Sequence, residues 1–220
     1  MPLRKHPVRD ALVFGLTLGL LALARYYDRR DREPVTSATL RNPNAAARNP
    51  LDGLAYLTPY PAAGQLADAG LYGAPTLPLL LSLHPRPRQE YPRILLLWAQ
   101  TIGLTFALTS VIKNRASRPR PYVLHPDFPR HAPLYRNDRA AFLSGHTAMA
   151  TAGATLFARL TTHYFPGWRL PSWVLAGTVA GATGFLRVRA AKHWPTDAVA
   201  GVGLGWGTSW VLWRCTIMDK

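Results

Sequence analysis

Residues 94–112 read Ile-Leu-Leu-Leu-Trp-Ala-Gln-Thr-Ile-Gly-Leu-Thr-Phe-Ala-Leu-Thr-Ser-Val-Ile and contain no charged side chain. A helix of about 20 apolar residues is long enough to cross the hydrocarbon core of a bilayer. The residues that follow, 113–121, include four cationic side chains. This junction predicts a transmembrane helix that ends at a strongly cationic membrane surface.

Five further apolar segments predict an all-α integral membrane bundle of about six transmembrane helices. Pro75 and Pro78 interrupt one segment, but prolines are tolerated in membrane helices where neighbouring groups satisfy the backbone. The chain length suits one domain, residues 1–220. The five segments are 11–27, 69–83, 140–158, 170–186 and 198–213.

The first apolar segment has two interpretations. It follows Arg4, Lys5 and Arg9, so residues 1–27 are either a membrane anchor or a cleavable signal peptide. Its apolar stretch is at the long end for a signal, which favours a retained anchor. Residues 28–66, which come next, are rich in Arg, Asn, Pro and Ala and predict an exposed connection without recognisable chemistry.

The composition is that of a chain solvated by lipid. Only 17% of the residues are charged, against about 25% in soluble domains. The net charge of +15 could indicate nucleic acid, but Arg and Lys flank apolar segments and form no aromatic-basic stripe, so no nucleic-acid partner is predicted. Cys215 is the single cysteine and no zinc-type Cys/His cluster is present, so we expect no disulfide, metal or cofactor.

Glycines recur at helical spacing in the last two apolar segments. Small residues four positions apart allow membrane helices to approach closely. We therefore expect these pairs to pack against neighbouring helices: Gly177 and Gly181, Gly201 and Gly205, and Gly203 and Gly207.

Residues 113–121 form the first of three short polar segments, here called polar islands. The other two also carry polar or ionisable side chains that cost free energy to place at a membrane boundary, and such residues indicate function. Ser144-Gly145-His146 comes at the start of an apolar segment, where backbone amides of a helix can bind phosphate. In the other island, His193 and Asp197 are four residues apart. The carboxylate could then reach one imidazole nitrogen and leave the other free to attack.

The three islands resemble the three-part signature of the type 2 phosphatidic acid phosphatase superfamily. Lys113 with Arg120-Pro121 matches the first motif, Lys, six residues, Arg-Pro. Ser144-Gly145-His146 matches the second, Pro-Ser-Gly-His, with Leu143 in place of the proline. Arg187, His193 and Asp197 match the third motif, which reads Ser-Arg, five residues, His, three residues and Asp. Leu186 stands in place of the serine. The resemblance covers residues 94–213.

The resemblance implies an acid phosphatase/haloperoxidase-like core and a metal-independent lipid phosphatase. His193 would attack phosphorus to form a phosphohistidine, Asp197 would orient it, and His146 would protonate the leaving oxygen and then activate water. The side chains implied to hold the phosphate are Lys113, Arg120, Ser144 and Arg187, together with the backbone amide of Gly145. Arg115, Arg118 and Arg189 lie outside the matched positions and are interpreted as flanking charges or headgroup contacts.

If all six segments span and the N-terminus is cytoplasmic, the three motifs share the outer face, so we expect a bacterial inner-membrane protein with a periplasmic active site. The partners expected are the membrane and a lipid phosphate, whose identity the sequence leaves open along with the oligomeric state. Three alternatives also stay open: a soluble periplasmic acid phosphatase, a non-catalytic lipid-binding or transport relative, and a vanadate-dependent haloperoxidase.

Overall fold

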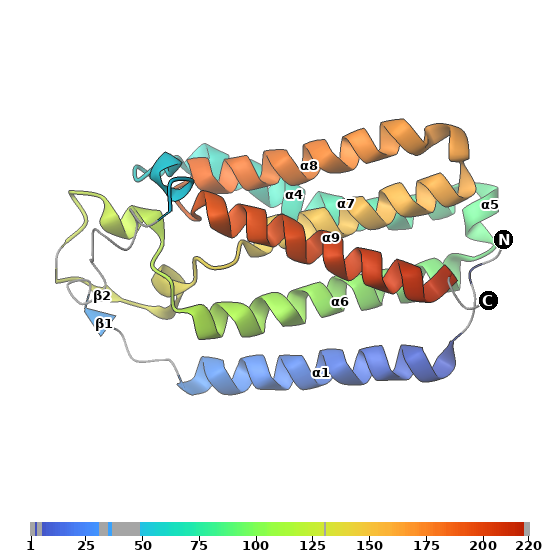
Figure 1. Cartoon of the computed structure of the whole chain (residues 1–220), viewed down its shortest axis with the longest axis horizontal. Coiled ribbons are helices and arrows are strands. Elements are labelled where there is room, and N and C mark those ends of the chain that lie inside the picture. Colours follow the sequence, from blue (N-terminus) through green and yellow to red (C-terminus); the bar gives the residue numbers. More distant parts are fainter. Residues whose placement is uncertain (1–2, 4–5, 31–34, 37–48, 130, 218–220) are drawn as a thin grey trace.

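A computed structural model describes residues 3, 6–30, 35–36, 49–129 and 131–217, and its main feature is a bundle of six long helices. The helices lie side by side, and the chain enters and leaves the bundle at the same end (Figure 1). They are α1 (Pro7–Arg30), α4 (Pro61–Leu80), α6 (Tyr91–Ala116), α7 (Gly145–Tyr164), α8 (Arg169–Arg189) and α9 (Pro195–Ile217).

Short elements connect the long helices. At the end away from the termini lie η1, η3, η4 and a two-stranded antiparallel pair, β1 with β2, in which Val35 is opposite Leu134 (Figure 1). The bounds are η1 (Asp52–Leu54), η2 (Leu81–Leu83), α5 (Pro85–Arg88), η3 (Pro121–Leu124), η4 (Arg136–Arg139), η5 (Pro166–Trp168), β1 (Val35–Thr36) and β2 (Pro133–Leu134).

The predicted helical bundle is confirmed, since each of the six apolar segments contains the greater part of a long helix. Several boundaries differ from the predicted segments, and two of these differences have a local cause. Pro61 begins α4 eight residues before position 69, because proline fits the first turn of a helix. Ser144 caps α7 and accepts a hydrogen bond from the amide of Thr147, so this helix begins at Gly145 and not at position 140.

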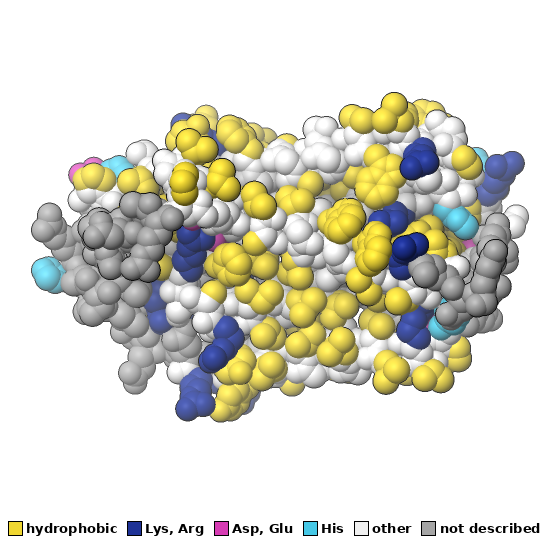
Figure 2. Space-filling model, viewed as in Figure 1, with side chains coloured by type: hydrophobic (Ala, Val, Ile, Leu, Met, Phe, Trp, Pro, Cys, Tyr) yellow, Lys and Arg dark blue, Asp and Glu magenta, His cyan; other side chains and the backbone are white. Residues whose placement is uncertain are grey.

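Three of the described helical stretches are long and apolar enough to cross a membrane: Pro7–Arg30, Pro61–Leu83 and the stretch Tyr91–Leu124. The total of six spans stays a prediction. On the face shown in Figure 2, hydrophobic side chains cover the middle of the bundle and Lys and Arg lie toward its two ends. An apolar belt with cationic ends is the surface expected of a membrane-embedded bundle.

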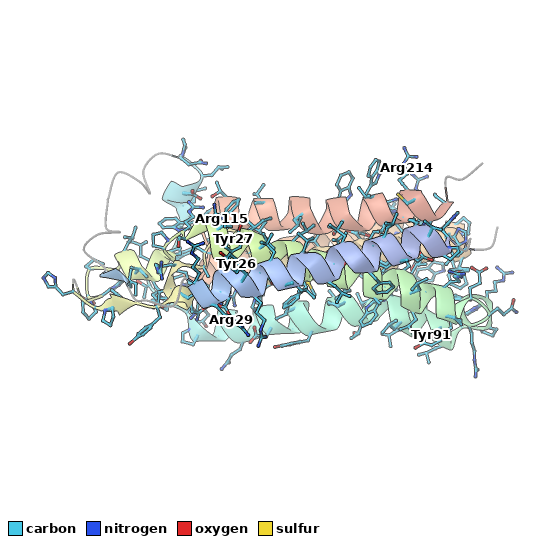
Figure 3. All side chains as sticks on the ribbon, turned by 90° about the horizontal axis from the view of Figure 1, so that it is seen from below. Tyr26, Tyr27, Arg29, Tyr91, Arg115 and Arg214 are labelled. Atoms are coloured by element: carbon cyan, nitrogen blue, oxygen red, sulfur yellow. The ribbon has the colours of Figure 1, made fainter. Side chains whose placement is uncertain are left out.

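Aromatic and cationic side chains pair at both ends of this belt. Arg115 lies over the ring of Tyr27, 4.9 Å from its centroid, and Arg214 lies over Trp210 at 5.1 Å. Figure 3 shows Arg115 beside Tyr26 and Tyr27 at one end of α1, and Arg214 at the opposite end of the bundle. Tyr, Trp and Arg are favoured at the two membrane–water interfaces, so these clusters are consistent with a bundle that crosses the bilayer.

Helix α7 is central and contacts α4, α6, α8 and α9. Its small residues allow close approach: a Cβ on Gly153 would lie 2.5 Å from the Cα of Pro75 in α4. Gly201 and Gly205 of α9 likewise face the backbone of residues 144–152, as predicted. The prediction is wrong for the other two glycine pairs, because within the described part of the chain a Cβ on Gly177, Gly181, Gly203 or Gly207 would meet no atom within 4 Å.

Helix α1 packs along α6. The side-chain amide of Asn114 donates to the carbonyl oxygen of Ala24 at 2.7 Å, and a Cβ on Gly103 would lie 3.5 Å from Thr17. At the end that carries the termini, Gln100 donates to Asp10 at 3.0 Å. Polar contacts therefore join α1 to α6 near both of its ends.

Candidate active site

The three predicted motifs meet at the end of the bundle opposite the termini. Lys113 lies in the last turn of α6, Arg187 lies in the last turn of α8, and His193 lies in the turn before α9. Gly145 begins α7, and a Cβ there would lie 3.5 Å from the Nζ of Lys113. Residues that are far apart in the sequence are therefore brought to one place by the ends of four helices, α6, α7, α8 and α9.

His193 is fully buried and has its two ring nitrogens in different environments. Nδ1 lies 2.6 Å from the carbonyl oxygen of Ala141. Because a carbonyl can only accept, Nδ1 carries the proton and Nε2 has a free lone pair. Nε2 is buried and has no hydrogen-bond partner among the described residues. This tautomer is the one required of a nitrogen nucleophile.

Three cations surround this imidazole. Burial, together with the positive charges of Lys113, Arg187 and Arg120, holds the pKa of His193 well below its ordinary value of 6.5. The ring is therefore neutral at physiological pH, which keeps the lone pair on Nε2 available.

Arg120 and Arg187 have unused donors. Each residue is only 6% exposed, and within the described residues the Nε of each has no acceptor. Arg120 does donate from its terminal nitrogen to Asn137 at 2.8 Å. A buried donor without an acceptor costs about 1–3 kcal/mol, so these two guanidinium groups are arranged for an anion that completes the site.

The predicted hydrogen bond between Asp197 and His193 is absent from the structure. The closest approach of the two groups is 3.8 Å, from Nδ1 to Oδ2. Asp197 instead accepts from the backbone amide of Trp194 at 2.8 Å and from the guanidinium of Arg118. Its carboxylate therefore holds the first turn of α9, and the carbonyl of Ala141 orients the imidazole.

A second acid, Asp52, completes this arrangement and was missed by the sequence analysis, which expected no chemistry in residues 28–66. Asp52 is buried, pairs with Arg118 at 2.6 Å and accepts from the hydroxyl of Thr196 at 2.8 Å. Arg118 was interpreted as a flanking charge or headgroup contact, but it joins Asp52 to Asp197. The guanidinium of Arg118 also lies over the ring of Trp194, with its Cζ 5.3 Å from the ring centroid.

The start of α7 brings Ser144 and Gly145 to the site. The hydroxyl of Ser144 is buried and lies 2.8 Å from the hydroxyl of Thr147, while its amide donates to the carbonyl of Asp197 at 3.0 Å. If Thr147 is the donor in the hydroxyl pair, the Ser144 proton stays available for an anion. Gly145 is the first residue of the helix, and amides at that position have no intrahelical acceptor.

His146 has a partner that the sequence did not indicate. Its Nε2 lies 2.8 Å from Oδ1 of Asp68, which projects from α4. Charges from Arg187 and Lys113 also act on His146, so the second histidine belongs to the same cluster. Within the described part of the chain, no group of three or more His, Cys, Asp or Glu side chains is placed to hold a metal ion.

Comparison with known proteins places this site in a family. The profile of the PAP2 superfamily matches residues 94–219. The chain belongs to the PAP2 superfamily. The match contains all three motifs, whereas Asp52 and Asp68 lie outside it.

Two PAP2-related proteins give further comparisons. A lipid A 1-phosphatase of Porphyromonas gingivalis is 42% identical over 66 residues, which cover 30% of this chain and 14% of that protein. The chain thus spans only a small part of the curated relative that it matches. The second is the crystal structure of a transmembrane PAP2-type phosphatidylglycerolphosphate phosphatase from Bacillus subtilis. It matches this chain with a TM-score of 0.59 and 18% sequence identity, and the match covers 96% of this chain and 97% of the other. This similarity shows a shared fold over nearly the whole chain.

Proposed function

We propose that this PAP2 protein is a metal-independent lipid phosphate phosphatase that works through a phosphohistidine intermediate. The observation that carries the proposal is the buried Nε2 of His193, which has no partner among the described residues and lies among cations, two of which, Arg120 and Arg187, have an unpaired Nε donor. A phosphoryl group supplies equatorial oxygens for the cations and a phosphorus atom for the nitrogen.

In the first step the Nε2 lone pair attacks phosphorus and the bond to the leaving oxygen breaks. Lys113, Arg120 and Arg187 stabilise the charge on the equatorial oxygens, with the Ser144 hydroxyl and the Gly145 amide as further donors. His146 gives a proton to the leaving oxygen, which departs as an alcohol, or as a phosphate if the substrate is a diphosphate.

In the second step water attacks the phosphohistidine. Neutral His146 takes a proton from that water, the phosphorus–nitrogen bond breaks, and inorganic phosphate leaves with His193 restored. During both steps the imidazole carries positive charge, and the carboxylate of Asp197, 3.8 Å from Nδ1, favours that charge.

Two apolar grooves support a lipid substrate. One of about 520 Å³ lies between α8 and α9 and is lined by residues such as Gly181, Phe185 and Val199. The other, of about 480 Å³, lies between α4 and α8 and is lined by residues such as Gly73. The two run along opposite sides of α8, whose last turn holds Arg187. A phosphate bound at Arg187 can therefore have its hydrocarbon chain beside α8, within the membrane.

We further propose that the active site faces the periplasm or the outside of a bacterial inner membrane and that α1 is a retained anchor. The motifs and the termini lie at opposite ends of the bundle (Figure 1). A cysteine placed near His131 should then react with an impermeant reagent outside intact cells, and one near Arg88 should not. The packing of Asn114 on Ala24 supports retention, and an intact mass that includes residues 1–27 would test it.

The function is tested by phosphate release from detergent-purified protein. The panel contains phosphatidic acid, phosphatidylglycerol phosphate, undecaprenyl diphosphate and a lipid A phosphate, each in mixed micelles. At least one should be hydrolysed with a much higher kcat/KM than a short soluble phosphomonoester, because confinement to the interface concentrates and orients the lipid. Equal kcat/KM for lipid and soluble substrates would contradict the lipid assignment.

A further inference from the structure

Asp68 is placed to act on His146 from a helix outside the family match. The two side chains are 2.8 Å apart, between Oδ1 of Asp68 and Nε2 of His146. Asp68 lies in α4, before residue 94, where the PAP2 match begins. Neither the motifs nor the family profile therefore assigns it a role.

The contact is built into the packing of α4 on α7. Both helices run from the site toward the opposite end of the bundle (Figure 1). Two turns beyond Asp68 and His146, the backbone of Pro75 meets Gly153, where a Cβ would lie only 2.5 Å from the Pro75 Cα. Any larger residue at Gly153 would separate the helices, so this glycine sets the spacing that brings the acid to the imidazole.

The charges around His146 explain why the acid matters. Burial of the imidazole, Arg187 from α8 and Lys113 from α6 all disfavour a protonated His146, and Asp68 from α4 is the group that opposes them. A proton donor with only cations near it would lose its proton too readily. Asp68 also fixes the ring, because accepting from Nε2 leaves Nδ1 as the nitrogen that exchanges a proton with the reaction.

We propose that Asp68 is a positioning residue that orients the His146 ring and stabilises the imidazolium from which the leaving oxygen takes its proton. The inference rests on the proposed phosphatase function. It gives α4 a direct part in the chemistry, and it predicts an effect that depends on the leaving group. A p-nitrophenolate leaving group needs no proton, whereas the alkoxide of a lipid does.

The experiment compares kcat for a lipid phosphate with kcat for p-nitrophenyl phosphate. Asp68→Asn should lower the lipid/aryl ratio by at least about tenfold, part of the roughly 10²–10⁴-fold that general acid catalysis contributes. Asp68→Glu, which keeps the carboxylate, should restore much of the ratio. Gln65→Ala, an exposed polar position one turn earlier in α4, should leave it unchanged. The alkaline limb of the kcat profile for the lipid should also move to lower pH in Asp68→Asn.

A double variant separates positioning from a structural role. His146→Ala should lower the same ratio, and adding Asp68→Asn to it should lower the ratio no further, because the acid acts through the imidazole. Equal losses on both substrates in Asp68→Asn, or losses that add to those of His146→Ala, would overturn the inference. If wild-type protein hydrolyses neither substrate, the proposed function itself fails.

Discussion

The Nδ1 of His193 lies 2.6 Å from the carbonyl oxygen of Ala141, which comes just before the second motif. A main-chain carbonyl oxygen does not titrate near neutral pH and does not depend on the side chain at its position. It therefore fixes the tautomer of His193 over the physiological pH range. The position of the Ala141 carbonyl depends in turn on neighbouring backbone contacts, including the Ala141 amide, which donates to the main-chain carbonyl oxygen of Arg118 at 3.0 Å. The proposed nucleophile is thus oriented by the loop that leads into α7.

We expect Arg187→Gln to move the acid limb of kcat/KM to higher pH. Positive charge near His193 helps to hold its pKa below 6.5, so removing one cation raises the pKa of the free enzyme. The imidazole then becomes protonated, and inactive, at a higher pH than in the wild type. KM should also rise, because a proposed phosphate ligand is lost. The measurement is kcat/KM against pH, and an acid limb that moves to lower pH would contradict the account.

Asp52→Ala should reduce kcat by at least about tenfold. Breaking an ion pair with a buried acid is costly, and Arg118, which holds Asp197, then keeps only one of its two carboxylate partners. Asp28→Ala is the matched control, since Asp28 also pairs with an arginine, Arg136 at 2.8 Å, but is 40% exposed. Exposed pairs contribute only about 0–1 kcal/mol, so this variant should keep wild-type activity. Similar losses in both would show that Asp52 has no special part in the site.

A phenylalanine at Gly181 should block the groove between α8 and α9. A Cβ at Gly181 meets no atom of the described residues within 4 Å, so the ring can enter the groove without displacing them. We expect kcat/KM for a long-chain lipid phosphate to fall by at least about tenfold, since misplacing a substrate by about 1 Å can slow its reaction about 10²-fold. Hydrolysis of a short soluble phosphomonoester should not change.

Two variants serve as controls for this substitution. Gly177→Phe lies one turn away on α8 and also faces open space, but Gly177 does not line the groove. Gly73→Phe fills the groove between α4 and α8 instead. Selective loss of lipid hydrolysis in Gly73→Phe and not in Gly181→Phe would place the lipid chain on the other side of α8.

Hydrolysis should survive chelation. The proposed phosphate ligands are Lys113, Arg120 and Arg187, and these take the place that metal ions have in many phosphoryl-transfer sites. We expect full activity in excess EDTA, measured as phosphate release from the preferred lipid. Complete loss in EDTA, restored by magnesium, would rule out the proposed mechanism.

The sequence predicted those features that depend on local pattern. Charge-free segments predicted the long helices, and motif spacing identified the residues that meet at their ends. The error at Asp197 also has a local cause. A spacing of four places two side chains together within a helix, but His193 precedes α9, which begins at Pro195.

Other features of the site depend on contacts between distant segments. Asp68 meets His146 across 78 positions, and Asp52 meets Thr196 across 144. No local pattern distinguishes these acids from solvated ones, because the packing of α4 on α7 and the fold of η1 on α9 create the contacts. The open glycines of α8 and α9 were likewise interpreted as packing sites because spacing does not show which face a neighbour covers.

The most direct test of the account is to find where phosphate becomes attached during turnover. Wild-type protein is mixed with ³²P-labelled lipid phosphate, quenched within one turnover in alkaline detergent that preserves phosphohistidine, and digested for peptide mapping. We predict label on His193 and none in His193→Ala, with label accumulating in a His146→Ala variant if removal of the base slows the second step more than the first. Label on a different residue, or turnover by His193→Ala, would contradict the account.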